Sequence, residues 1–575
     1  MATELLRASA LTAATLLCAC TMGPNFHRPE TTPPPSWAGA ASAPADLPSK
    51  PVARAYDGRL WWSVFKDPVL DGLVDEAQRQ NIDLQTAALR IEEARAQRGS
   101  AKSQGLPQVN GSGIGGRQRA SKNGLASGLT GGGSSSAAAG GSGAAAAPAP
   151  SPYSDLFDVG FDATWELDLW GKMRRGVEAA DANIVSAEQA RGDALVSLTA
   201  EVARTYLSLR GAQRQRAIVL ADIADEQQLL KLTNSRADNG FASQADAVQQ
   251  QAQLSASQAQ LPPIEQNIDQ ATNRLALLLA LPPGALAERL GPLPQADVAL
   301  PPEVPVGLPG DLLRRRPDIL KSEADLHAAT AKVGQAKAQL FPSITLGGTG
   351  GFQSIHADSL TDWASRFWVG GAQVSIPIFE GGKLKAQIRT ADAQMKEAAL
   401  NWRGTVLSAY HDANNALVAY ADEQRHASAL ARQLNDARRS DELMRSRFRN
   451  GFVSMIEVLD AQRSVHQAEE QALQSNVTAS TDLVALYKAL GGDWNGDAAS
   501  VASTALSGHR RKLSRPGPSE SRPVSTTPTA PPPPGRGWPT PRCGPARRES
   551  AAPPSPAACS AIPGAAGCGR VGGRT

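Results

Sequence analysis

The pattern of apolar and polar positions divides this chain into long helical stretches and short strands. In residues 172–239, apolar positions recur at steps of three and four: Leu195, Leu198, Val202, Thr205 and Leu209. This spacing is typical of coiled-coil packing and predicts one helix about 100 Å long with a narrow apolar seam. Such a helix, with its other faces exposed to solvent, suits the wall of a hollow tube. An antiparallel coiled-coil rod is the alternative, because it would show the same pattern.

One turn occurs twice and separates the long helical stretches. Both copies fit the pattern Arg-x-x-Asn-Gly-Phe-x-Ser, from Arg236 to Ser243 and from Arg447 to Ser454. Asn-Gly favours a turn because both residues tolerate positive φ. We therefore expect each copy to form the tip of a long helical hairpin.

Short segments with alternating apolar and polar residues predict β-strands. The clearest is 156–169, and similar segments lie at about 106–117, 341–353 and 367–379. Strands of about ten residues that are apolar on one face match a membrane β-barrel, and a half-buried soluble sheet is the alternative. Two hairpins cannot close a barrel and would leave open edges, so the pattern predicts a homo-oligomer.

The chain is an internal duplication. Lys172 aligns with Lys383, 211 residues later, and the two tips keep the same offset. A second offset, of 235 residues, aligns Pro107 with Pro342. The offsets differ by 24 residues, the length of the Gly/Ser/Ala-rich segment 128–151, which we interpret as a loop inserted at the surface.

These signals predict an order of segments along the chain. In chain order they are a signal peptide at 1–19, a lipid-anchored extended arm at 20–60, a first structural repeat at 61–283 with its hairpin at 172–281 and tip at 236–243, a connector at 284–310, a second repeat at 311–494 with its hairpin at 383–491 and tip at 447–454, and a tail at 495–575. The tail lacks periodicity, which indicates disorder or out-of-frame translation of GC-rich DNA.

Three local features refine this outline. Asp67 is expected to cap a helix that begins at Pro68. Pro262-Pro263 is expected to end or kink the returning helix of the first repeat. The arginines 314–316 are expected to form a solvated or inter-subunit salt-bridging turn.

The N-terminus carries an export signal. A short apolar run begins at Leu11 and ends in Leu17-Cys18-Ala19-Cys20. Cys20 has a small residue before it and Leu17 three positions earlier, so it resembles the lipidated cysteine of bacterial lipoproteins. An ordinary secreted protein with an incidental cysteine is the alternative. Thr21, where Asp would favour inner-membrane retention, favours the outer membrane.

Charge and cysteine positions exclude several classes of function. The net charge is +3, but eleven Lys/Arg against three Asp/Glu follow residue 496, so the body is acidic and nucleic-acid binding is not expected. All five cysteines lie before residue 21 or after residue 542, which excludes disulfides, thiolate metal sites and a cysteine nucleophile from the body. The seven histidines form no metalloprotease spacing, and no serine lies in a nucleophile or P-loop motif. We expect no enzymatic activity, no cofactor and no metal site.

Several motifs together resemble the TolC-like outer membrane efflux proteins, and in particular the lipoprotein branch of NodT/OprM type that serves resistance-nodulation-division (RND) pumps. In chain order the matching segments are Cys20 to Pro29, Trp61 to Leu70, Asp168 to Lys172, Arg315 to Ile319, Phe341 to Ser343, Ile378 to Lys383, Asn450 to Ser454 and Asp460 to Arg463. The resemblance covers about residues 20 to 494.

The resemblance implies a fold class that is mainly α with a membrane β-barrel. Three chains would form a homotrimer, in which the hairpins build a long periplasmic α-helical barrel. Each chain would give four strands to a shared twelve-stranded β-barrel. The lipid anchor and this barrel would both lie in the outer membrane.

The resemblance also implies two sites near the tips. Residues of the repeated turn would dock a periplasmic adaptor (membrane fusion) protein: Arg236, Gly240, Ser243, Arg447, Gly451 and Ser454. Residues one turn above would line a periplasmic gate: Ile456, Glu457 and Asp460, with Asp246 and Gln249 as first-repeat counterparts. Acidic rings favour cations, and an apolar ring gates by dewetting. A plain surface carboxylate and a helix-terminal arginine are the alternatives.

The function implied is the exit duct of a tripartite efflux pump. It would conduct drugs or small solutes passively from an inner-membrane RND-type transporter and its adaptor to the exterior. A type I protein-secretion duct has the same architecture, and the lipid cysteine and the segment Arg315 to Ile319 favour solute efflux over it. A non-conducting periplasmic coiled-coil scaffold is the alternative from another class.

Overall fold

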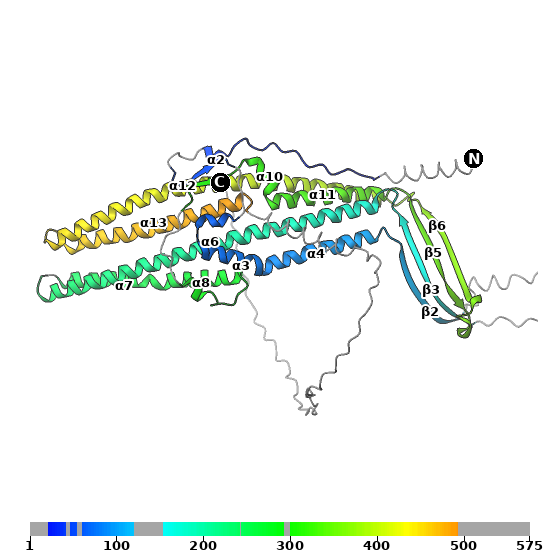
Figure 1. The fold of residues 1–575 in the computed structure, drawn as a ribbon, viewed down its shortest axis with the longest axis horizontal. Helices are drawn as coiled ribbons and strands as arrows, with labels where there is room; N and C mark the ends of the chain where they lie inside the picture. The colour runs from blue at the N-terminus through cyan, green and yellow to red at the C-terminus, as the bar shows by residue number, and fades with distance from the viewer. Residues whose placement is uncertain are drawn as a thin grey trace, which may run out of the picture. The chain divides into compact units, whose positions relative to one another are not determined.

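The computed structural model describes residues 21–41, 47–54, 60–119, 153–241, 243–291 and 300–492. All of them belong to one unit, Met1–Gly508, built from long helices and a four-stranded sheet (Figure 1). No helix within these ranges combines the length and the apolar character needed to cross a membrane. The signal peptide, Cys20, the segment 128–151 and the tail 495–575 lie outside the described residues.

The first repeat leads through helices into two strands and then into a long hairpin. Its elements are η1 (Trp61–Phe65), α3 (Pro68–Gln80), α4 (Ile82–Ser103), β2 (Gln108–Arg119), β3 (Tyr153–Leu167), α6 (Lys172–Asp238), α7 (Gln244–Ala259), α8 (Leu261–Leu278) and α9 (Ala287–Leu290). The 67 residues of α6 span about 100 Å. α6 therefore runs from the sheet to the tip without a break.

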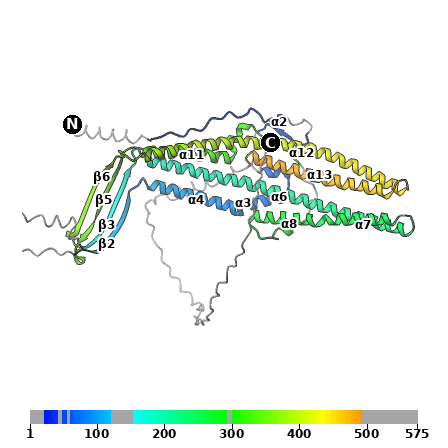
Figure 2. The same ribbon diagram turned by 180° about the vertical axis from the view of Figure 1, so that it is seen from behind.

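The second repeat has the same order of strands and hairpin. Its elements are η2 (Pro309–Asp311), α10 (Leu312–Arg315), α11 (Pro317–Ala338), β5 (Ser343–Ser354), η3 (Ala357–Ser359), η4 (Trp363–Ser365), β6 (Arg366–Ser375), α12 (Lys383–Arg449) and α13 (Met455–Ala489). Like α6, α12 has 67 residues and ends directly before an Asn-Gly tip. Both views show α12 beside α13 and α6 beside α7 (Figures 1 and 2).

The described part of the N-terminal arm is packed against both repeats and the connector between them. It contains α2 (Ala38–Ala41) and β1 (Lys50–Val52), and β1 pairs in parallel with β4 (Glu303–Pro305). The Met22 amide donates to the Trp170 carbonyl at 3.0 Å, between β3 and α6. The Arg175 guanidinium on α6 donates to Asn25 Oδ1 at 2.7 Å. These contacts hold the segment that follows Cys20 where the sheet meets the helices.

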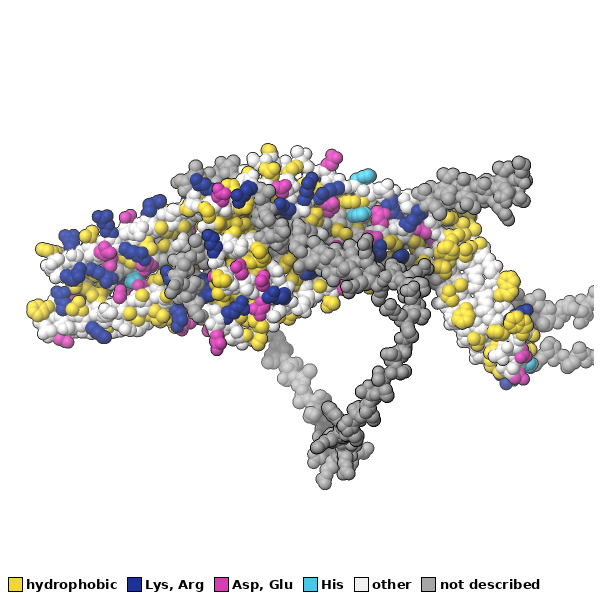
Figure 3. All heavy atoms as spheres, in the orientation of Figure 1, with side chains coloured by type: hydrophobic (Ala, Val, Ile, Leu, Met, Phe, Trp, Pro, Cys, Tyr) yellow, Lys and Arg dark blue, Asp and Glu magenta, His cyan; other side chains and the backbone are white. Residues whose placement is uncertain are grey.

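The four long strands form one antiparallel sheet in the order β2-β3-β5-β6. One face carries exposed large apolar side chains: Val159, Phe161, Trp165, Leu346, Trp368 and Val374. The other face carries polar pairs between strands, with Asn110 donating to Asp162 at 3.1 Å and Gln353 donating to Asp158 at 3.0 Å. Figure 3 shows hydrophobic side chains on the sheet, whereas charged side chains are frequent on the helices. Among the described residues, β2 and β6 are each paired on one side only.

The last strand is shorter than the alternation predicts. The sequence predicts a strand up to Phe379, but β6 ends at Ser375. Ser375 pairs with Ser343, the first residue of β5, so later residues have no strand opposite them. Pro377 also lacks the amide hydrogen that would continue the ladder. The other three strands lie within three residues of their predicted bounds.

The apolar face of α6 is wider than the predicted seam. Leu195, Leu198, Val202 and Leu209 are buried, whereas Thr205 is half-buried. Further positions on α6 are also buried: Ala203, Tyr206 and Leu207. The seam prediction was too narrow because α6 packs against α4, α8, α11 and α13, and not against a single partner.

The two prolines of the returning helix separate α7 from α8. α7 ends at Ala259, and Pro262 and Pro263 lie in the first turn of α8. The first turn tolerates proline because its amides have no intrahelical acceptor. The second repeat returns as one helix, the 35 residues of α13.

Arg316 is held within the chain, which corrects the expected solvated or inter-subunit turn at this residue, whereas Arg314 is exposed as expected. The Arg316 side chain is only 12% exposed and donates to both carboxylate oxygens of Asp318, at 3.0 and 2.6 Å. It also donates to the carbonyl of Ala489 at 3.0 Å. The residue therefore ties the start of α11 to the end of α13.

The main core lies where α3, α6, α12 and α13 meet, and it is rich in buried tyrosines. Asp67 caps α3 through Oδ1, as predicted, and its Oδ2 accepts a hydrogen bond from the Tyr206 hydroxyl. Tyr487 stacks on Trp61 with ring centroids 5.3 Å apart. Burial raises the pKa of Tyr206 to about 12, and burial also raises the pKa of Tyr420 to about 12.

We expect this core to weaken at alkaline pH. A tyrosine with a raised folded pKa stabilises the fold below its unfolded pKa of about 10, and this contribution is lost as the pH rises through the folded value of about 12. The thermal midpoint should fall over this range, and Tyr206→Phe should make the fall shallower. Tyr153→Phe, at an exposed tyrosine of β3, should leave it unchanged. Equal pH profiles for Tyr206→Phe and the wild type would contradict the assignment.

Candidate functional site

The two hairpin tips share one backbone conformation. After α6 the Phe241 amide donates to the Arg236 carbonyl at 2.7 Å, and after α12 the Phe452 amide donates to the Arg447 carbonyl at 2.9 Å. In each tip the glycine amide donates to a carbonyl three residues earlier, at 3.0 Å. These paired bonds define a Schellman motif, which satisfies carbonyls left free at the helix end. The repeat therefore encodes the same helix stop twice.

Only the glycine of each Asn-Gly pair has positive φ. Gly240 and Gly451 have φ of +74° and +78°, whereas both asparagines have φ of −89°. The asparagines tolerate positive φ but do not adopt it in either tip. Their side chains act differently, because Asn239 and Asn450 donate to carbonyls one helical turn back, at 2.6 and 2.8 Å.

A helix start follows each tip directly. The Ser243 amide donates to Asp246 at 3.0 Å, and the Ser454 amide donates to Glu457 at 2.6 Å. Serine followed by an acidic residue three positions later forms a capping box at a helix N-terminus. Asp246 and Glu457, which the family resemblance places at the gate, are thus bonded to the first turns of their own helices.

Replacing Gly451 by Ala should loosen the second tip. A side chain at φ +78° costs about 1–2 kcal/mol, although no atom lies within 4 Å of the Cβ position. Amide hydrogen exchange at the tip should become about tenfold faster. Gly404→Ala is the matched control: it lies inside α12 with equally open space, and alanine there should stabilise by about 0.5–1 kcal/mol. Equal exchange rates at the tip in both variants would contradict this prediction.

The tip arginines differ in their surroundings, although the sequence repeats them. Arg236 is half-buried, and its guanidinium carbon lies 4.7 Å from the centre of the Phe448 ring on α12. Nearby, Leu229 of α6 packs against a small cluster around Met455. Arg447 is exposed. The first tip arginine therefore holds the two hairpins together, while the second faces outward.

The predicted gate residues lie one turn above the tips and are not gathered within a single chain. Ile456 is 50% exposed. The Asp460 side chain is 64% exposed and forms an ion pair with Arg463 at 3.2 Å. Gln249 is half-buried on α7. Arg463 of α13 donates to Gln253, which also lies on α7, at 3.2 Å. Because Asp460 and Ile456 are both exposed, both side chains can contact other copies of the chain.

The prediction from sequence missed one pair of residues at the tips. Phe241 and Phe452 are 77% and 76% exposed, although both are large and apolar. Aromatic side chains are enriched at the centres of protein interfaces. The signal was present in the sequence, because a phenylalanine follows Asn-Gly in both copies of the turn.

The arrangement of helices, sheet and tips agrees with comparisons to known proteins. The family model described as "Outer membrane efflux protein" matches residues 73–281 and 308–492. This chain belongs to the outer membrane efflux protein family. The resemblance predicted from its motifs is therefore confirmed, as is an outer-membrane location.

Relatives support the outer membrane efflux assignment along most of the chain. "Pyoverdine export outer membrane protein OpmQ" of Pseudomonas putida is 30% identical over 481 residues, which cover 84% of this chain and 98% of the relative. "Outer membrane protein OprJ" of Pseudomonas aeruginosa is 31% identical over 488 residues, covering 85% of this chain and 96% of the relative. Both names describe outer membrane proteins, and neither describes an enzyme.

A solved structure supports the fold of this outer membrane efflux protein. The outer-membrane channel OprN matches it with a TM-score of 0.73 and 31% sequence identity, over 83% of this chain and all of that one. The fold class predicted from the sequence, mainly α with a membrane β-barrel, is confirmed. The duct function predicted with it follows from the same likeness, because OprN is described as a channel.

Proposed function

We propose that this protein is the outer-membrane duct of a tripartite efflux pump and conducts drugs or small solutes passively to the exterior. Its partners are a periplasmic adaptor and an inner-membrane RND-type transporter. The observation that carries the proposal is the sheet. Its exposed apolar face suits contact with lipid, and its two edges, unpaired among the described residues, suit pairing with strands of other chains. Three copies would supply twelve strands and remove every open edge.

The lipid anchor fits the same membrane as the sheet. Cys20 is proposed to carry the lipid, and it precedes Met22 by two residues. Met22 is bonded to Trp170 at the end of the helices that adjoins the sheet. A lipid at residue 20 would therefore lie near the membrane that surrounds the strands, and would add to their anchoring.

The tips are proposed to dock the adaptor. The positive φ of Gly240 and Gly451 and the serine caps at 243 and 454 fix the two tips in one shape. That shape presents Arg447 together with an exposed phenylalanine on each tip. Arg236 takes part mainly by fixing the first hairpin against the second, through its contact with Phe448.

The gate is proposed to lie one turn above the tips. Asp460 and Ile456 are exposed on α13, so three copies could form one acidic ring and one apolar ring. Asp246 and Glu457 are assigned mainly to helix capping, because their carboxylates are already bonded to serine amides. Gln249 occupies the first-repeat position that corresponds to Asp460 and adds no charge.

Cross-linking between strand edges tests the assembly. The chain has no cysteine between residues 21 and 542, so pairs can be introduced cleanly once Cys543, Cys559 and Cys568 are serine. Ser112→Cys on β2, combined in turn with cysteines at positions 367–374 of β6, should give products that stop at three chains. Ser112→Cys with Thr345→Cys on the interior strand β5 should give none. The absence of cross-links for every β6 position, or a ladder beyond three chains, would overturn the proposal.

A further inference from the structure

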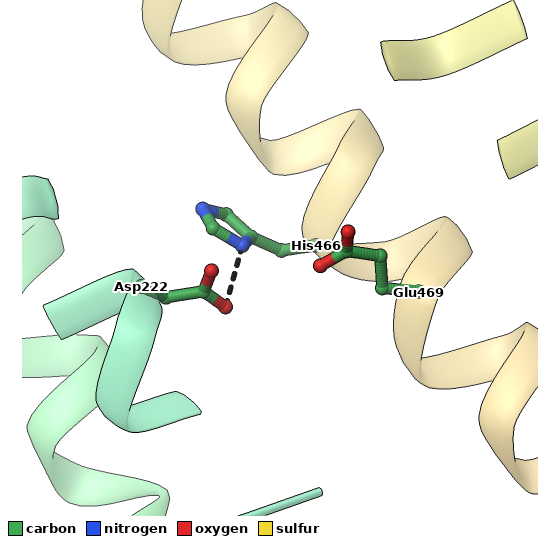
Figure 4. A group of neighbouring side chains, drawn as sticks. All are labelled: Asp222, His466 and Glu469. Carbon is green, nitrogen blue, oxygen red and sulfur yellow. Dashed lines mark ion pairs between the residues drawn. The ribbon is translucent and has the colours of Figure 1, made fainter. Parts of the chain in front are cut away.

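Four titratable side chains meet between the two hairpins, well above the tips. Asp222 and Glu226 lie one turn apart on α6, and His466 and Glu469 lie one turn apart on α13. His466 Nδ1 is 2.7 Å from Asp222 Oδ2, and Nε2 is 4.0 Å from Glu226 Oε1. Figure 4 shows Asp222 approaching the imidazole from α6, with the Glu469 carboxylate beside it on the histidine's own helix. Ligand atoms of Asp222, His466 and Glu469 all lie within 4.8 Å of one another.

The burial of Glu226 is a second, independent indication that this cluster binds a cation. Its relative exposure is 1%. Its Oε1 accepts hydrogen bonds from Ser257 at 3.0 Å and Gln253 at 3.3 Å, but Oε2 has no hydrogen-bond partner among the described residues. A buried carboxylate without full compensation is costly, so such groups are paired with cations or coordinate metals.

The charges around the cluster match a divalent cation. Asp222, Glu226 and Glu469 bring three negative charges, and Arg438 of α12 brings one positive charge by donating to Glu469 Oε1 at 2.6 Å. Arg463 and Glu470 line the same pocket and add one charge of each sign, so with a neutral imidazole at His466 two further positive charges balance the group. Glu469 keeps its second oxygen available, because Arg438 contacts only Oε1.

We propose that Asp222, His466 and Glu469 bind one divalent transition-metal ion that joins α6 to α13. One imidazole and two carboxylates form a ligand set that suits Zn²⁺, Co²⁺ or Ni²⁺, whereas Mg²⁺ and Ca²⁺ prefer oxygen ligands alone. The side chains of Asp222 and His466 remain 20% and 27% exposed, so an ion and a water ligand can enter. Glu226 adds negative charge 4.0 Å from the imidazole Nε2.

A metal at this place would stabilise the contact between the two repeats. Asp222 belongs to the first hairpin and His466 to the second, and α6 and α13 pack directly on each other. An ion held by both helices favours the packed arrangement over any in which they separate. The site lies within one chain, so the ion would bind whether or not the tips dock an adaptor or α13 lines a gate.

Metal titration of the full-length protein tests the site. Cys543, Cys559 and Cys568 are changed to serine in every sample, because their thiolates would compete for the ion. After chelator treatment, Co²⁺ absorbance and Zn²⁺ calorimetry should show one ion bound per chain, with a Kd in the micromolar range that is typical of weak zinc sites. His466→Ala and Asp222→Asn should each weaken binding at least about tenfold.

His426 provides the matched control. It is also on a helix of the second hairpin, but it is exposed and pairs with Glu423 Oε1 at 3.3 Å. His426→Ala should keep wild-type binding, and Zn²⁺ should raise the Tm of this variant and of the wild type by a few degrees but leave His466→Ala unchanged. No binding by the wild type would reduce the cluster to an ion pair, and equal binding by His466→Ala and the wild type would place the ion elsewhere. Either result overturns the proposal.

Discussion

Reversing the charge of Arg447 to Glu should abolish adaptor-dependent efflux while leaving the assembled protein intact. Arg447 is exposed at the second tip, so its replacement removes no packing within the chain. A charge reversed at a docking surface replaces attraction by repulsion, and we expect adaptor affinity to fall about tenfold to hundredfold. The measurement is binding of the purified adaptor of the same pump, together with substrate accumulation in cells.

Two further variants make this result specific to the tip. Arg432→Glu changes an exposed arginine on the same helix, fifteen residues or about 22 Å from Arg447, and should bind the adaptor normally. Arg236→Glu should instead loosen the contact with Phe448 and lower thermal stability. Normal adaptor binding by Arg447→Glu would remove the tip from the docking site.

Neutralising Asp460 should change which ions pass through the duct. If three copies of Asp460 form a ring, Asp460→Asn removes three negative charges from a narrow passage, and cation preference should fall by about a factor of two or more. The ion pair with Arg463, three residues further along α13, would also be lost, and we expect the conductance to rise. Reversal potentials in a salt gradient report the selectivity, and single-channel records report the conductance.

Asp460→Glu is the matched control for the gate. It keeps the charge and moves it by one methylene, so cation preference should remain near the wild-type value. Glu457 is a less suitable target, because its carboxylate accepts the Ser454 amide and its loss would disturb the helix start. A single-channel record unchanged by Asp460→Asn would remove this residue from the gate.

The sequence predicted features that local chemistry determines. The Asn-Gly-Phe turns end α6 and α12 at equivalent residues because glycine alone accepts positive φ without strain. Asp67 and Pro68 begin α3 as predicted, because capping needs only neighbouring residues. The alternation of 156–169 located β3, although the end of β6 depended on where its partner β5 begins. Strand ends are set by pairing, and the alternation of one strand does not carry that information.

Features that depend on contacts between residues far apart in the chain could not be predicted from the sequence. Arg236 and Arg447 occupy equal positions in the repeat, and only packing shows that one stacks on Phe448. Likewise, Asp222 and His466 lie 244 residues apart, and neither spacing on its own helix resembles a known metal motif. Their meeting follows from the packing of α6 on α13, which periodicity alone does not specify.

Ion conductance is the most direct test of the duct. Purified protein, added to a planar lipid bilayer under voltage, should give discrete single-channel currents, and Asp460→Asn should raise them. Protein that inserts and cross-links into three-chain products, yet carries no current in either form, would contradict a duct and favour a closed scaffold.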